Sequence, residues 1–131
     1  MTVDSNLNQL TTVELLRSIS KTANVAGTGV LVTDYIGSVR VTAASGAITA
    51  GDDNSTYTFT IQHSNESGAN YTNVTGYGDD LTACNNVGGV TYVDIPTRDL
   101  KAYIRVMGNI AGANNPAFPV SVTMTGIKQV A

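Results

Sequence analysis

The sequence predicts an all-β fold, an antiparallel, jelly-roll-like β-sandwich of about eight strands with an N-terminal arm. First, a chain of 131 residues suits a single domain. Second, several stretches alternate polar with apolar residues, which is the period of a strand with one buried face. Third, clusters of Gly, Asn and Asp separate these stretches at nearly regular spacing and favour tight turns. We therefore expect an arm and first strand in residues 1–23 and a sandwich domain in residues 24–131.

The N-terminal segment is ambiguous between a helix and an extended arm. Four apolar residues recur there at near-helical spacing: Leu7, Leu10, Val13 and Leu16. Asp4 or Ser5 could cap a short helix over residues 5–17. The β-branched run Thr11-Thr12-Val13 favours an extended chain, which is the interpretation we prefer.

Such an arm would expose an apolar patch if it were free in solution. We therefore expect an interface at Leu7, Leu10, Val13 and Leu16. In this hypothesis residues 11–20 pair with a sheet, most simply the edge of a neighbouring chain, and residues 1–10 lie across another subunit.

The sandwich is predicted by four clear alternating stretches: residues 38–43, 56–62, 100–107 and 118–125. Weaker strand candidates are residues 15–20, 29–33, 71–75 and 89–95. Alternation predicts a buried set comprising Val39, Val41, Tyr57, Phe59, Ile61, Ile104, Val120 and Val122. It places Thr58, Thr60, Thr123 and Thr125 on the outer faces. Pro119 lacks an amide donor and suits the start or edge of its strand.

The charge and composition of the chain exclude several classes of function. The net charge is −3, and the seven Lys and Arg residues are scattered, so we expect no nucleic-acid partner. No apolar stretch approaches the roughly 20 residues of a transmembrane helix, so we expect no membrane partner. Charged residues make up only 13% of the chain, which favours a surface partly covered by partners. The first ten residues resemble no secretion signal, so we expect synthesis in the cytosol of the cell of origin.

No constellation of residues indicates catalysis, and we predict no catalytic, cofactor-binding or metal-binding residue. His63 is the only histidine and Cys84 the only cysteine, so neither a catalytic pair nor a Cys-based zinc site is indicated. We interpret His63 as a structural side chain that points inward at a strand end. A role as ligand or base is the alternative.

Two acidic loops and a group of loop tyrosines leave binding alternatives open. Asp52, Asp53, Asp79 and Asp80 suit exposed turns, with calcium binding as the alternative. Sugar stacking on aromatic rings would use Tyr71 and Tyr77, together with Asn85 and Asn86. The absence of Trp weakens this second alternative.

From Asp34 to the C-terminus, several short motifs follow one another in a fixed order. The first motifs are Tyr35-Ile-Gly37 before Ser38-Val-Arg-Val41, and Ile61-Gln-His-Ser64 before Asn65-Glu-Ser-Gly68. Next come Leu100-Lys-Ala-Tyr-Ile-Arg105 and Pro116-Ala-Phe-Pro-Val-Ser-Val122. This order resembles that of the small capsid decoration (cement) proteins of tailed phages. Residues before Asn24 and residues 77–89 lie outside the resemblance.

The resemblance implies a jelly-roll-like, non-enzymatic virion protein that clamps neighbouring coat subunits on the outer capsid surface. Its implied partners are the major capsid protein and other copies of itself, as a dimer or trimer, and no cofactor is implied. One alternative is a carbohydrate- or receptor-binding module of a phage fibre or spike. Further alternatives are a sandwich domain of a tail or baseplate protein and, least favoured, an enzyme.

Overall fold

A computed structural model describes residues 8–21, 24–52, 54–77 and 88–129. The strands are β1 Asn8–Lys21, β2 Val25–Ala26, β3 Val30–Leu31, β4 Tyr35–Ser45, β5 Thr56–Ser64, β6 Thr72–Asn73, β7 Gly89–Pro96, β8 Tyr103–Ala111 and β9 Phe118–Gln129. A single turn of 3-10 helix, η3 (Thr97–Asp99), joins β7 to β8. The predicted all-β class is confirmed.

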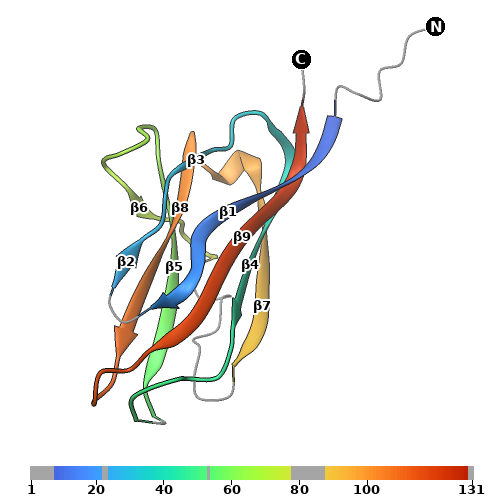
Figure 1. The fold of residues 1–131 in the computed structure, drawn as a ribbon. Coiled ribbons are helices and arrows are strands. Elements are labelled where there is room, and N and C mark those ends of the chain that lie inside the picture. The colour runs from blue at the N-terminus through green and yellow to red at the C-terminus, as the bar shows by residue number, and fades with distance from the viewer. Residues whose placement is uncertain (1–7, 22–23, 53, 78–87, 130–131) are drawn as a thin grey trace, which may run out of the picture.

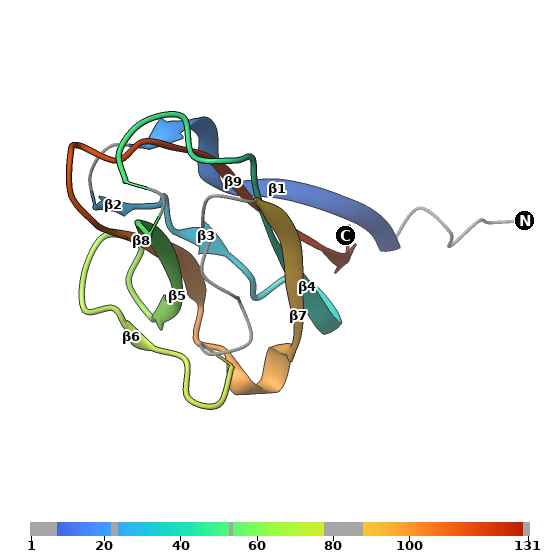
Figure 2. The same cartoon turned by 90° about the horizontal axis from the view of Figure 1, so that it is seen from below.

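Two antiparallel sheets, whose strands are labelled in Figure 1, pack face to face, as the view from below in Figure 2 shows. The four-stranded sheet has the order β1-β9-β4-β7. The five-stranded sheet has the order β2-β8-β5-β6, with β3 also paired to β8. Sequence neighbours β4 and β5 lie in different sheets, so the chain crosses between the layers. The predicted sandwich is thereby confirmed.

The core lies between the sheets and contains the residues that alternation predicts. The whole predicted set is buried: Val39, Val41, Tyr57, Phe59, Ile61, Ile104, Val120 and Val122. The ring of Tyr57 packs at 5.6 Å from that of Phe59 and at 5.9 Å from that of Phe118. Thr58 is exposed, and Thr60, Thr123 and Thr125 are half-buried on the outer faces. The register predicted for these strands is confirmed.

The strand boundaries differ most around β8. The sequence predicts a strand over residues 100–107, whereas β8 spans Tyr103–Ala111. The shift arises because the Leu100 amide donates to the Thr97 carbonyl at 3.1 Å and closes the η3 turn before the strand can begin. The candidates at 29–33 and 71–75 shorten to the two-residue strands β3 and β6.

The N-terminal segment is extended from residue 8 onward and belongs to the chain's own sandwich. β1 pairs antiparallel with β9, from Asn8 opposite Gln129 to Lys21 opposite Phe118. The preference for an extended chain over a helix is therefore correct for residues 8–17. The expected pairing of residues 11–20 with a sheet is confirmed, but the sheet is the chain's own and not that of a neighbouring chain, because the partner strand is β9.

Candidate interaction surface

The predicted interface residues of the N-terminal segment do not share one face. Leu10 is exposed, Val13 is half-buried, and Leu16 is 2% exposed within the chain's own core. A spacing of three residues gathers side chains on a helix but sends them to opposite faces of a strand. The assignment of Leu16 to an intermolecular interface is therefore wrong, and Leu7 lies outside the described residues. Leu10 remains a candidate.

Leu10 belongs to a row of exposed apolar side chains on the outer face of the four-stranded sheet. It pairs in register with Ile127 of β9, which in turn pairs with Ile36 of β4. Directly opposed residues in antiparallel strands point to the same face, so the three side chains form one row, here called the apolar row. Leu10 is 69% exposed, Ile127 39% and Ile36 43%.

A bulge in β4 puts Ile36 into the apolar row. The register between β4 and β9 shifts between Ile36 and Val39, where Gly37 has a φ of 77°. A positive φ of this size is readily adopted by glycine and strained for most other residues. Because of the shift, Ile36 lies opposite Ile127, whereas an unbroken register from Val39 and Gly126 would place it opposite Gln129. Sequence reasoning missed this row, although Ile127 continues the outward phase of Thr123 and Thr125 and gave a readable signal.

Beside the apolar row the same face is polar with little net charge. Thr12 and Thr125 are opposite each other and share a hydrogen bond of 3.1 Å between their hydroxyl oxygens. Arg40 Nε donates to Asp94 at 2.8 Å, and its guanidinium also lies 4.0 Å from the centre of the Tyr92 ring. The hydrogen bond from Arg40 lowers the pKa of Asp94, and the same bond raises the pKa of Arg40. Arg40 and Asp94 therefore neutralise each other, and Glu14, opposite Thr123, is an exposed charge on the same face.

His63 makes the contact expected of a structural histidine. It is half-buried at the end of β5, where its Nδ1 accepts a 3.2 Å hydrogen bond from the Lys101 amide. Burial, and then the positive charge of Lys101, lower the pKa of His63. A hollow beside it is lined also by Tyr77 and Asp99, whose side chains are joined by a 2.7 Å hydrogen bond. Cys84 lies outside the described residues.

The predicted acidic loops form no cluster in the part of the chain that is described. Asp52 is half-buried rather than exposed, because Asn114 Nδ2 donates to its carboxylate at 2.5 Å and its backbone bonds Ala113 and Ser55. Asp53, Asp79 and Asp80 lie outside the described residues. Nowhere in residues 8–21, 24–52, 54–77 and 88–129 do three His, Cys, Asp or Glu side chains gather as metal ligands.

The tyrosines considered for sugar stacking are engaged within the protein. The Tyr71 hydroxyl donates to the Ser67 carbonyl at 2.8 Å, and Arg105 covers its ring at 4.0 Å. Tyr77 is bound to Asp99 as described above, and Asn85 and Asn86 lie outside the described residues. The Tyr71 ring therefore already has a cation on one face where a sugar would stack.

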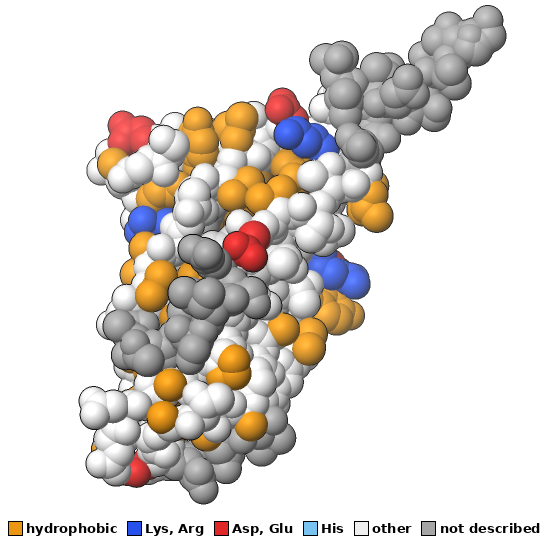
Figure 3. All heavy atoms as spheres, viewed as in Figure 1, with side chains coloured by type: hydrophobic (Ala, Val, Ile, Leu, Met, Phe, Trp, Pro, Cys, Tyr) orange, Lys and Arg blue, Asp and Glu red, His pale blue; other side chains and the backbone are white. Residues whose placement is uncertain are grey.

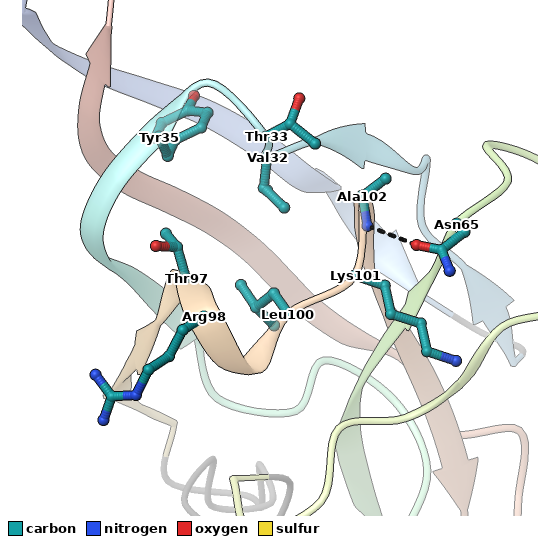
Figure 4. A pocket seen from close by; sticks show the side chains of 9 residues that line it. All are labelled: Val32, Thr33, Tyr35, Asn65, Thr97, Arg98, Leu100, Lys101 and Ala102. Atoms are coloured by element: carbon teal, nitrogen blue, oxygen red, sulfur yellow. Dashed lines mark hydrogen bonds between the residues drawn. The ribbon is translucent and has the colours of Figure 1, made fainter.

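An open cleft of about 400 Å³ lies at the η3 end of the sandwich (Figure 4). Val32, Tyr35 and Leu100 contribute apolar surface, and Asn65 Oδ1 accepts a 3.4 Å hydrogen bond from the Ala102 amide at its rim. The charged ends of Arg98 and Lys101 point to opposite sides in Figure 4. They therefore do not converge on a common anion, and the cleft shows no assembled polar site.

No helix in the described part of the chain is long and apolar enough to cross a membrane.

No protein-family model and no curated protein matches the chain. Among solved structures, the chain is similar to the VP2 subviral particle of infectious bursal disease virus, with a TM-score of 0.53 and 12% identity over 93% of this chain and 33% of that one. It thus spans about a third of the length of that chain.

Structures of the Gx and Gt strains of the same virus match with TM-scores of 0.47, at 12% and 13% identity. These matches cover 93% and 95% of this chain and 32% and 37% of those chains. At 12% identity, the likeness to VP2 shows the fold alone: this β-rich fold also occurs in a viral capsid protein.

Proposed function

We propose that this protein is a structural component of a virus particle. More specifically, we propose a capsid decoration (cement) subunit of a tailed phage that binds the outer surface of the assembled coat and stabilises its lattice. Its main partner is the major capsid protein. The protein is made in the host cytoplasm and acts on the capsid surface.

The observation that carries this proposal is the outer face of the four-stranded sheet. The apolar row lies there beside Thr12, Thr125 and the Arg40–Asp94 ion pair. Depletion of charge around apolar residues, with polar groups at the rim, is the composition of protein–protein interfaces. Figure 3 shows the wider surface to be mostly uncharged, with few acidic or basic side chains on the visible face. Such a face suits a protein partner better than nucleic acid.

A surface of this kind can stabilise a shell without strong individual contacts. A protein that binds the assembled lattice, and not free coat subunits, shifts the equilibrium toward the lattice by mass action. Contacts repeated over many copies add up when one rigid shell holds them together. The capsid-type fold of the VP2 neighbour and the order of motifs from Asp34 onward support the same proposal.

The N-terminal segment supplies a second proposed contact. Leu10 is 69% exposed near the start of β1, and residues 1–7 precede that strand. We propose that residues 1–7 contact a neighbouring subunit on the capsid and that Leu10 contributes to the same contact. Deleting residues 1–7 should leave the sandwich folded, by circular dichroism, and should weaken capsid binding. Unchanged binding would remove the segment from the interface.

The test of the proposed function is binding to purified capsids of the cognate phage, measured by co-sedimentation. Wild-type protein should saturate capsids at a copy number comparable to that of the coat protein. Leu10→Asp combined with Ile36→Asp places two charges in the apolar row and should weaken binding at least tenfold. Thr58→Asp, on the exposed face of the other sheet, is the matched control and should bind like wild type. Failure of the wild-type protein to bind capsids would refute the proposed function.

A further inference from the structure

Among the described residues, β7 forms a long sheet edge that lacks the usual protection against pairing with another strand. The four-stranded sheet ends in β1 on one side and β7 on the other, and within the described residues neither has a strand on its outer side (Figure 1). The free backbone N–H and C=O groups of an edge are a template for a further strand. Soluble monomers therefore blunt their edges with charges, bulges, prolines or short length.

The opposite edge of the same sheet, β1, carries such protection in its described residues. β1 has register shifts between Glu14 and Leu16 and between Leu16 and Ile19, and Glu14 places an exposed charge in its middle. The outer strands of the five-stranded sheet, β2, β3 and β6, are each two residues long. These features make regular pairing along those edges unfavourable.

β7 has an even backbone and apolar side chains. Its eight residues pair with β4 without a register shift, from Pro96 opposite Ser38 to Gly89 opposite Ser45. On the outer face, Val90 is 68% and Tyr92 55% exposed. Figure 3 shows hydrophobic side chains reaching the margin of the molecule where β7 runs in Figure 1.

The two residues of β7 that could hinder pairing with another strand, Asp94 and Pro96, give little protection. Its one charged residue, Asp94, is bound by Arg40 through Nε at 2.8 Å and Nη2 at 3.0 Å, so this carboxylate meets an incoming strand already neutralised. Pro96 is the last residue of the strand and leaves residues 89–95 able to pair.

We propose that β7 pairs antiparallel with β7 of a second copy of this chain, so that two four-stranded sheets join into one continuous sheet. The pairing is isologous, about a two-fold axis perpendicular to the sheet. This inference stands apart from the proposed function, because it requires only the free chain in solution.

The side chains of β7 favour one register of this pairing. With the axis at Thr91, Val90 lies opposite Tyr92 of the second copy, and Tyr92 lies opposite Val90 of the second copy. Pairs of an aromatic with a β-branched residue stabilise antiparallel strands. In the same register the last strand pair is Val93 opposite Gly89 of the second copy, so Asp94 lies beyond the paired residues and no two like charges meet. The strand is thus complementary to itself, which is why we commit to a second copy as the occupant.

The oligomeric state of the full chain tests this proposal by sedimentation velocity over a range of concentrations. Wild-type protein should form a concentration-dependent dimer. Val90→Lys combined with Tyr92→Lys would bring like charges directly opposite each other and should raise the dimer dissociation constant at least tenfold. The matched control is Leu10→Lys combined with Ile36→Lys, which adds the same charge to the same face away from β7 and should leave the dimer intact. Circular dichroism checks that each variant is folded.

A charge swap tests the register itself. Val90→Lys and Tyr92→Glu, each weakened as a homodimer, should associate when mixed, because opposite charges would then face each other across the two copies. A wild-type chain that stays monomeric at all concentrations overturns the proposal, as does loss of the dimer in the control pair. If the wild-type chain is monomeric and the Val90→Lys, Tyr92→Lys variant loses capsid binding, the β7 edge would instead pair with a strand of another protein.

Discussion

Phe59 provides the most direct test of the core, because its side chain is 4% exposed and its ring packs against Tyr57. Replacing Phe59 with Ala removes the apolar contacts of the ring and leaves a cavity that neighbouring strands can fill only in part. The expected loss is about 3–5 kcal/mol of unfolding free energy. A domain of this size has roughly 5–15 kcal/mol in total, so the variant should remain folded but lose a large share of its stability.

The loss is measured by urea denaturation followed by far-ultraviolet circular dichroism, since the chain has no Trp for fluorescence. The midpoint should fall while the slope with denaturant stays unchanged, which attributes the effect to stability alone. Thr58→Ala, on the neighbouring outward-facing residue, is the control; it removes a long hydrogen bond to the Asn109 carbonyl and a β-branched side chain and should cost at most about 1 kcal/mol. Equal losses in the two variants, or a loss below about 1 kcal/mol in Phe59→Ala, would refute the assignment of the buried face.

Three further predictions concern titration and metal. His63 has a pKa below its ordinary value of 6.5, so the unfolded chain binds a proton more readily than the folded chain. The free energy of unfolding should therefore fall as the pH drops from 6.5 toward the folded pKa. His63→Gln should flatten this pH dependence in denaturation curves between pH 7 and 5, and curves unchanged by the substitution would contradict the prediction. Asp94 has a pKa below 3.8, so the small stabilisation from its pair with Arg40 is present above that pH and is lost below the folded pKa. The unfolding free energies of Asp94→Asn and wild type should therefore differ at pH 7 in low salt and become equal at low pH or in high salt. A difference that persists under both conditions would point to another cause. EDTA should leave the melting temperature unchanged, because Asp52 is satisfied by Asn114; a drop of several degrees would revive the calcium alternative.

Alternation predicted the core well because each clear strand has one buried face. Val39, Phe59 and Val122 could be placed from sequence since their neighbours at plus and minus one are polar or small. The same rule fails where a bulge interrupts the period. Leu15 and Leu16 are consecutive, yet both are buried, because the register of β1 shifts between Glu14 and Leu16. Side-chain alternation in the sequence does not report such an inserted residue.

The candidate surface was harder to predict than the core. An amphipathic strand adds to any sheet with a free edge, and its sequence does not say whether that edge belongs to the same chain. β1 was therefore assigned to a neighbour, although β9 is its partner. The apolar row joins Leu10, Ile36 and Ile127 from three strands distant in sequence. Its assembly depends on strand order, which no local pattern in these segments specifies.

The contact of the apolar row with the coat and the pairing of two chains through β7 would be more effective together than separately. Full burial of an aliphatic side chain contributes about 1.5–3 kcal/mol, so the partly exposed apolar row can supply roughly 2–5 kcal/mol when a partner covers it. The translational and rotational freedom lost on association costs an estimated 4–15 kcal/mol, which one such row does not offset. Pairing through β7 would hold two outer faces side by side in one sheet, because the perpendicular two-fold axis keeps both on the same side. Once the first face has bound a coat subunit, the second would bind its neighbour at a high effective concentration, with no further loss of translational freedom. Weak, nearly uncharged faces would then hold a subunit on an ordered shell while leaving isolated coat subunits unbound.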